Sequence, residues 1–143
     1  MQKKNYKIGY TQGVFDMFHV GHLNLINNAK DYCDYLIVGV NSDKLVEDYK
    51  KLTPNINEDD RALIVKNIKA VDETIIVDTL DKMEIYKTLK FDCIFIGDDW
   101  IQNSRWKNTV EEMRNIGVDV VFLPYTKKIS STQLRKKLGE QNS

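Results

Sequence analysis

The stretch IGYTQGVFDMFHVGH, residues Ile8–His22, decides how this chain folds. Its first part, from Ile8 to Thr11, is a short, mainly apolar run that predicts a buried β-strand. Glycines follow at positions 13 and 21, and residues from Val20 to Tyr32 then place their apolar side chains at helical spacing. A strand that turns through glycine into a helix is typical of the first half of a β-α-β unit.

The same alternation of strands and helices continues along the chain. Four further apolar runs predict strands, at Tyr35–Val40, Thr74–Val77, Cys93–Gly97 and Val118–Leu123. Helices are predicted after Asn57, near Asp81, around Trp106 and from Ser130 or Ser131, whereas residues 43–57 are expected to form an irregular surface loop. Because the apolar runs are continuous rather than alternating, both faces of each strand should be covered. We therefore expect an α/β fold in a single domain, residues 1–143, with a Rossmann-like, doubly wound, five-stranded parallel sheet and helices on both faces.

Composition narrows the class of protein. Lysine plus arginine and aspartate plus glutamate both number 21, so the formal net charge is zero, which argues against a general nucleic-acid binder. No apolar run approaches the roughly 18–20 residues of a membrane helix, and the N-terminal residues lack the apolar core of a signal peptide. The two cysteines, Cys33 and Cys93, supply neither a disulfide framework nor a four-ligand zinc site. We expect a cytoplasmic protein with no membrane insertion and no nucleic-acid partner.

The two histidines of the chain, His19 and His22, stand three residues apart where the first helix begins. At that spacing both imidazoles lie on one side of the helix start. A helix N-terminus presents unpaired N–H groups and a partial positive charge, which bind phosphate, and Gly13 and Gly21 let the backbone come close to a ligand. The imidazoles would add donors for phosphate oxygens and for negative charge that develops during a reaction.

Two other interpretations of the histidines stay open. They could be ordinary polar residues at the start of a helix, or they could join Asp16 in a catalytic zinc site, for which three protein ligands are sufficient. In either case the carboxyl ends of the parallel strands form the expected ligand edge. Besides the histidine loop, that edge receives polar segments at 41–43, 97–100 and 124–132.

The segment GVFDMFHVGH, residues 13–22, resembles the signature GxFDxxHxGH of the cytidylyltransferase family. The resemblance extends over nearly the whole chain, through DYLIVGV followed by Ser42 and Asp43, Arg61, VDE at 71–73, GDDW at 97–100 and ISST at 129–132. The histidine loop alone marks the HxGH nucleotidyltransferase superfamily, whereas GDDW and ISST narrow the resemblance to the cytidylyltransferase branch. Within that branch the chain is most similar to the bacterial glycerol-3-phosphate cytidylyltransferases.

This resemblance implies a reaction. In the family, a phosphate oxygen of a phosphorylated alcohol attacks the α-phosphorus of CTP and pyrophosphate leaves, with help from Mg²⁺ or a similar divalent cation. The implied acceptor is sn-glycerol 3-phosphate, and the product is CDP-glycerol for teichoic acid or capsule synthesis. Catalysis without a covalent enzyme intermediate consists of positioning and charge stabilisation. The family also implies a homodimer, for whose interface Tyr49, Tyr86 and Trp106 are candidates.

The resemblance further assigns roles to individual residues. Catalytic roles fall to His19, His22, Lys50 and Arg61; this arginine stands near a helix start, where the dipole disfavours a cation and a phosphate partner would explain it. Nucleotide binding is assigned to Gly13, Val14, Phe15, His19, Gly21, His22, Lys51, Asp98, Tyr125, Ile129, Ser130, Ser131 and Thr132. Substrate binding is assigned to Asp16, Lys50, Lys82 and Trp100. Side chains alone form no metal site: Mg²⁺ would be held mainly by the triphosphate, with Asp16 as a candidate ligand.

One departure from the family pattern bears on the substrates. The family's run Arg-Thr-Glu-Gly-Ile-Ser is YTKKIS in this chain, so Tyr125 replaces an arginine that grips phosphate. The type of reaction is unaffected, but alternatives stay open for its substrates. These are ATP in place of CTP, another acceptor (phosphoethanolamine, phosphocholine, a polyol phosphate, or a flavin or pantetheine phosphate), and a nucleotide-binding module without catalysis.

Overall fold

The computed structural model of this chain describes residues 6–97 and 104–124. Its strands are β1 (Tyr6–Gly13), β2 (Cys33–Asn41), β3 (Glu73–Val77), β4 (Cys93–Gly97) and β5 (Asp119–Leu123). They form one parallel sheet in the order β3-β2-β1-β4-β5. The helices are α1 (Val20–Lys30), α2 (Asp43–Lys50), α3 (Glu58–Lys66), α4 (Lys82–Leu89) and α5 (Ser104–Asn115). The predicted Rossmann-like α/β fold is confirmed.

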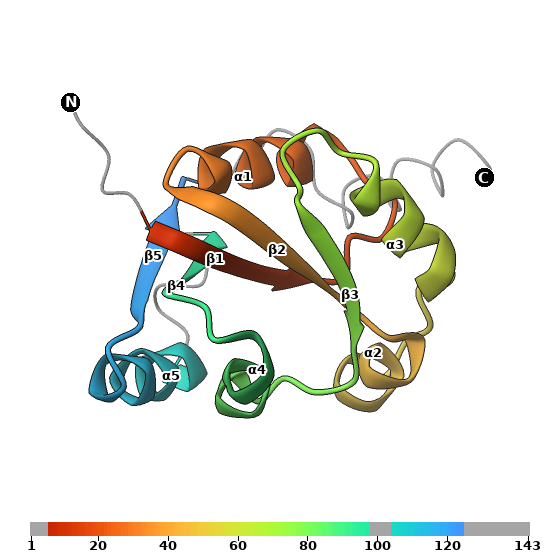
Figure 1. Cartoon of the computed structure of the whole chain (residues 1–143). Coiled ribbons are helices and arrows are strands. Elements are labelled where there is room, and N and C mark those ends of the chain that lie inside the picture. Colours follow the sequence, from red (N-terminus) through yellow and green to blue (C-terminus); the bar gives the residue numbers. More distant parts are fainter. Residues whose placement is uncertain (1–5, 98–103, 125–143) are drawn as a thin grey trace.

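Helices cover both faces of the sheet. Figure 1 shows α1 and α3 on one face and α2, α4 and α5 along the other. Two apolar cores fill the space between sheet and helices, and successive residues of β2 point into different cores: Val38 packs in the core under α1 and α3, Ile37 in the core over α4 and α5. Burial on both faces explains why the strands read as continuous apolar runs.

Polar caps set the helix starts. Asn57 begins α3 by accepting the N–H of Asp60, and Asp81 begins α4 by accepting the N–H groups of Met83 and Glu84, as the sequence predicted. Side-chain caps of this kind satisfy N–H groups that have no partner inside the helix.

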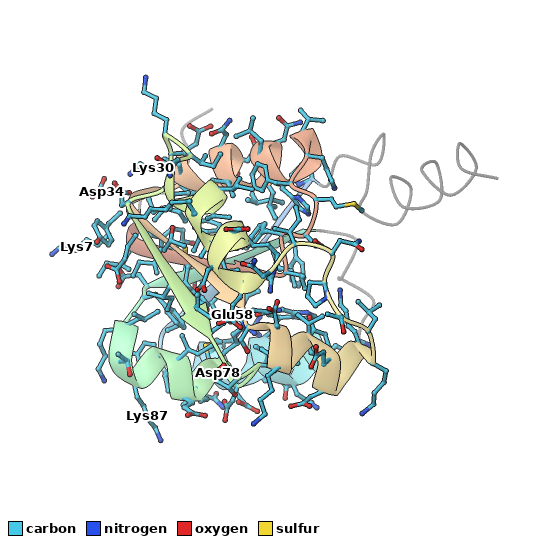
Figure 2. The ribbon with its side chains drawn as sticks, turned by 90° about the vertical axis from the view of Figure 1, so that its right-hand side faces the viewer. Lys7, Lys30, Asp34, Glu58, Asp78 and Lys87 are labelled. Atoms are coloured by element: carbon cyan, nitrogen blue, oxygen red, sulfur yellow. The ribbon has the colours of Figure 1, made fainter. Side chains whose placement is uncertain are left out.

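One prediction was wrong: residues 43–50 form a helix, α2, and not an irregular loop. The hydroxyl of Ser42 caps it, Lys51 ends it in a left-handed conformation (φ 58°), and Val46 is its one buried residue. Leu45, Val46 and Tyr49 lie at helical spacing, but a helix of 8 residues is too short for that pattern to be decisive. Glu58 lies between α3 and α2 (Figure 2), where its carboxylate accepts the N–H of Asp43 and its own N–H donates to the Asp43 carboxylate.

The order in which strands are added to the sheet reverses at β1. After β3 the chain crosses over to form β4 on the other side of β1, so the neighbours of β1 are β2 and β4. β1 is in register with β2 from Tyr6 to Gly13, but it pairs with β4 at Gly9 and Tyr10, beyond which the Thr11 hydroxyl donates to the carbonyl of Phe95 (2.9 Å). Such a reversal point, at the carboxyl ends of the strands, is where open α/β sheets bind ligands.

Candidate functional site

The loop between β1 and α1 has an unusual backbone. Phe15 and Met17 adopt positive φ angles of 55° and 50°, a conformation that costs a non-glycine residue on the order of 1 kcal/mol or more. Packing holds the loop in this shape: the ring of Phe15 is buried, with its centroid 6.2 Å from that of Phe18 and 5.4 Å from that of His22. The resulting turn places His19 at the N-cap position of α1.

The two histidines cap α1 reciprocally. The N–H of Gly21 donates to Nδ1 of His19 (3.0 Å), and the N–H of His19 donates to Nδ1 of His22 (3.3 Å). Their rings stack with centroids 4.0 Å apart. Because each Nδ1 accepts a hydrogen bond, a neutral ring must carry its hydrogen on Nε2. Both imidazoles therefore present an Nε2–H donor, and the N–H of Gly21, expected to bind phosphate, is already used by the cap.

Burial keeps both rings neutral. It lowers the pKa of His22 to about 4, helped by the proximity of His19 and opposed by the charge of Asp16. Burial likewise lowers the pKa of His19. Nε2 of His19 is buried and has no hydrogen-bond partner among residues 6–97 and 104–124. A neutral, buried donor without an acceptor is suited to an oxygen of a bound anion.

Asp16 is buried beneath this loop and ties it to the segment before α3. One carboxylate oxygen accepts the N–H of Asn55 (2.9 Å), and the other accepts the N–H of Ile56 (3.0 Å). The carboxylate thus fixes the chain that follows Lys50 and Lys51 against the histidine loop. Both oxygens face backbone donors, which makes Asp16 a poor fit for a magnesium ligand.

Arg61 is fully buried, and its guanidinium joins four segments. Nε donates to the carbonyl of Ile56 (2.8 Å), Nη1 to the carbonyls of Val14 (2.7 Å) and Asn41 (2.8 Å), and Nη2 forms an ion pair with Asp43 (2.6 Å). The loop after β1, the end of β2 and the start of α2 are therefore fixed to α3 by one side chain. The cation that seemed misplaced near a helix start has carbonyl and carboxylate partners inside the protein.

A pocket of about 120 Å³ opens beside the histidine loop, at the carboxyl ends of β1 and β2. It is lined by Gln12, Gly13, Val14, Asn41, Tyr49, Lys50, Leu80, Lys82 and Trp106. Lys82 is buried: its ammonium donates to the carbonyl of Leu80 (3.1 Å) and lies 5.3 Å from the centre of the Trp106 ring. Lys50, at the end of α2, lies 5.7 Å from the ring centre of Tyr49.

The structure brings together part of the predicted site. Gly13, Val14, Lys50 and Lys82 line the pocket, and His19 and His22 lie at the start of α1. Phe15, Gly21, Asp16 and Arg61 are buried in and beneath the histidine loop, and Lys51 is exposed at the end of α2. Asp98, Trp100, Tyr125, Ile129, Ser130, Ser131 and Thr132 lie outside the described residues.

Sequence reasoning did not assign Gln12, Tyr49 or Trp106 to the ligand site, and it placed Asn41 there only as part of the polar segment 41–43 at the ligand edge. The positions of Gln12 and Asn41 at the ends of the two central strands were the available signal for them. Tyr49 and Trp106, expected at a dimer interface, are half-buried and line the pocket, and Tyr86 packs edge-on against Phe91.

Neither a metal-binding cluster nor a membrane-spanning helix is present in residues 6–97 and 104–124. No group of three or more histidine, cysteine, aspartate or glutamate residues there could hold a metal ion. No helix in the same residues has the length and apolar character needed to cross a membrane.

The fold and the histidine loop define a Rossmann-like α/β protein with an HxGH loop at the start of its first helix. The cytidylyltransferase-like family model matches residues 10–137. The chain therefore belongs to the cytidylyltransferase-like family of nucleotidyltransferases, as the sequence signature indicated.

Two relatives of the chain that carry different names illustrate the similarity. The chain is 36% identical over 129 residues to the bifunctional protein HldE of Hyphomonas neptunium, with 90% of the chain covered and 26% of that protein. It is 38% identical over 130 residues to the FAD synthase of Thermococcus sibiricus, with coverages of 89% and 86%. The chain thus spans about a quarter of the length of the HldE relative. A lipopolysaccharide core biosynthesis protein of Thermoplasma volcanium has a similar structure (TM-score 0.72, 25% identity, 87% of this chain and 99% of that one).

Replacing Arg61 by methionine should destabilise the protein by about 3–5 kcal/mol, because the Asp43 carboxylate and the carbonyls beneath the loop lose their buried partner. Urea unfolding followed by circular dichroism measures this. Arg114→Met is the matched control, since Arg114 is exposed on α5 and should change stability by no more than about 0.5 kcal/mol. Equal effects of the two substitutions would contradict the linking role of Arg61.

The stability of the protein should fall as the pH drops from about 6.5 towards 4. The folded-state pKa of His22 is about 4, below the ordinary value of about 6.5, so the unfolded chain takes up the proton first. Each such histidine contributes a slope of at most about 1.4 kcal/mol per pH unit in this window. Urea midpoints at pH 7, 6 and 5 measure the slope, and His22→Gln should flatten it. An unchanged slope in that variant would show that His22 titrates normally.

Proposed function

We propose that this protein transfers a cytidylyl group from CTP to a small phosphorylated alcohol, with sn-glycerol 3-phosphate as the acceptor and CDP-glycerol and pyrophosphate as products. The observation that carries the proposal is the buried Nε2–H of His19, which has no acceptor among the described residues, within the HxGH loop of a nucleotidyltransferase family. A buried donor left unpaired costs about 1–3 kcal/mol. A phosphate oxygen of the nucleotide would remove that cost.

The chemistry follows from the neutral histidines. An oxygen of the acceptor phosphate attacks the α-phosphorus of the nucleotide, a new P–O bond forms, and the bond to the β-phosphate breaks, with its electron pair leaving on pyrophosphate. The Nε2–H groups of His19 and His22 donate to oxygens on which negative charge develops, and neither ring needs to gain or lose a proton. Lowered pKa values keep this arrangement intact across the neutral range.

The pocket beside the loop is the proposed acceptor site. Lys50 and Lys82 supply positive charge on its walls, and Gly13 and Val14 connect it to the histidine loop. Lys51 and the predicted residues outside the described ranges (Asp98, Trp100, Tyr125, Ile129, Ser130, Ser131 and Thr132) stay proposals for contacts with the nucleotide or the acceptor. Arg61 and Asp16 act by holding the loop in place, because their polar atoms face backbone and side-chain partners inside the protein.

Mg²⁺ belongs to the proposal as an ion bound through the triphosphate. The described side chains do not form a site that fits it, since Asp16 is engaged by two backbone N–H groups. We further propose a single-domain, cytoplasmic, homodimeric enzyme that supplies teichoic acid or capsule synthesis.

Adenylyl transfer to a flavin phosphate is the second candidate function. The similarity to the FAD synthase of Thermococcus sibiricus, which covers 86% of that protein, favours it. The two candidates differ in both substrates, so one assay separates them.

Pyrophosphate release tests the function directly. The purified chain is incubated with Mg²⁺, with CTP or ATP, and with sn-glycerol 3-phosphate or flavin mononucleotide. We expect pyrophosphate and CDP-glycerol from the first pair. FAD formation from ATP would replace this proposal with the second candidate, and no pyrophosphate from any combination, polyol and sugar phosphates included, would overturn nucleotidyl transfer.

His19→Asn separates catalysis from helix capping. Asparagine is a favourable N-cap residue and keeps an acceptor for the N–H of Gly21, but it lacks the imidazole Nε2–H. We expect kcat to fall by about 10²–10³ while the melting temperature stays close to that of the parent. His19→Ala is the comparison: it should lose the same activity and also about 1 kcal/mol of stability. Near-normal turnover in His19→Asn would remove this imidazole from the mechanism.

A further inference from the structure

A chain of hydrogen bonds runs beneath the pocket from the interior of the sheet. The hydroxyl of Tyr10 donates to Oε1 of Gln12 (2.7 Å). Nε2 of Gln12 donates to Oδ1 of Asn41 (2.8 Å) and to the carbonyl of Thr79 (3.1 Å). Nδ2 of Asn41 donates to the hydroxyl oxygen of Tyr49 (3.1 Å). Three of these residues, Gln12, Asn41 and Tyr49, line the pocket.

Tyr10 lies at the buried end of this chain of hydrogen bonds. Its side chain is fully buried, and its ring stacks on Phe91 with centroids 5.1 Å apart. Burial raises the pKa of Tyr10, so that the phenol keeps its hydrogen at any working pH. The carbonyl of Thr79 can only accept, so the NH₂ group of Gln12 must face it and Asn41, and the oxygen of that amide then accepts from Tyr10. The orientation of the Asn41 amide follows from that of Gln12 in the same way.

The fixed amides offer the pocket a complementary pair of groups. An amide oxygen can accept two hydrogen bonds, and an amide nitrogen can donate two. Among residues 6–97 and 104–124, Oε1 of Gln12 accepts from Tyr10 alone, and Nδ2 of Asn41 donates to Tyr49 alone. One acceptor position on Gln12 and one donor position on Asn41 therefore remain. Hydroxyl groups, which both donate and accept, can satisfy each of them.

We propose that Gln12 and Asn41 recognise hydroxyl groups of the acceptor, and that Tyr10, which is bonded to Gln12, is a positioning residue for the two amides. The acceptor class is then a small polyhydroxylated phosphate, a polyol or sugar phosphate, with its phosphate on the side of Lys50 and Lys82. Pocket size agrees: about 120 Å³ is well below the roughly 300–1,000 Å³ of sites for drug-sized ligands, and a flavin is of that larger size. This inference rests on the proposed nucleotidyl transfer.

The test compares acceptors with and without hydroxyl groups. Initial rates are measured with the nucleotide that the protein uses and with sn-glycerol 3-phosphate, ribose 5-phosphate, flavin mononucleotide or n-propyl phosphate, which keeps the phosphate and carbon chain of the first but has no hydroxyl. We expect kcat/KM to favour a hydroxylated acceptor over n-propyl phosphate by at least about a hundredfold, since a site built to bind a hydroxyl rejects the analogue that lacks it.

Tyr10→Phe removes one hydroxyl that touches no ligand. It should raise KM for the hydroxylated acceptor about tenfold, the effect of one lost hydrogen bond, and leave KM for the nucleotide and the rate with n-propyl phosphate unchanged. Gln12→Met should remove the preference for the hydroxylated acceptor altogether. Tyr6→Phe is the matched control, because Tyr6 lies on the same strand and its hydroxyl bonds Asp119 (2.8 Å) away from the pocket; both KM values should stay as they were.

Each outcome decides between the claims. Equal use of n-propyl phosphate, or an acceptor preference that survives in both Tyr10→Phe and Gln12→Met, overturns hydroxyl recognition but leaves nucleotidyl transfer standing. Turnover of flavin mononucleotide alone overturns the small polyol or sugar phosphate as acceptor, although its ribityl chain also carries hydroxyl groups. Absence of pyrophosphate with every acceptor overturns both the inference and the proposed function.

Discussion

The buried guanidinium of Arg61 is the interaction on which the arrangement of the site depends. A single side chain accounts for the positions of the loop after β1, the end of β2, the start of α2 and the chain before α3. An arginine can do this because its planar group carries five N–H donors in fixed directions, which here meet three carbonyls and a carboxylate. Lysine, with one nitrogen on a flexible stem, could not satisfy the same partners. The left-handed Phe15 and Met17 are tolerated because Arg61 and Asp16 hold the loop from below.

Much of this fold was readable in the sequence because its signals are local. Runs such as that of β4 (Cys93–Gly97) are continuous and apolar, and Asn57 and Asp81 are strong cap residues, so the strands and the starts of α3 and α4 were predicted. Helix α2 was missed because it buries only Val46 and depends on contacts with α3, above all those between Asp43 and Glu58. Tertiary contacts of this kind leave no periodic pattern.

The site was predictable in its residues but not in the way they work. The spacing of His19 and His22 pointed to phosphate binding at a helix N-terminus. That each ring caps the helix through Nδ1, and so must offer Nε2–H, depends on backbone angles that no motif reports. Arg61 was expected to meet a ligand, since a sequence shows the charge of a residue but not the carbonyls around it. Gln12 was overlooked, and Asn41 was placed at the ligand edge without a role, because the role of an amide depends on its neighbours.

The reversal of the strand order at β1 determines how a ligand can bind to the protein. β1 and β4 are joined near Gly9 and Tyr10, and beyond that point a side-chain bond from Thr11 replaces the ladder. The carboxyl ends of these two strands are therefore held in the folded state by a side chain and not by continuous strand pairing. A ligand that binds between them would have no backbone ladder to break there.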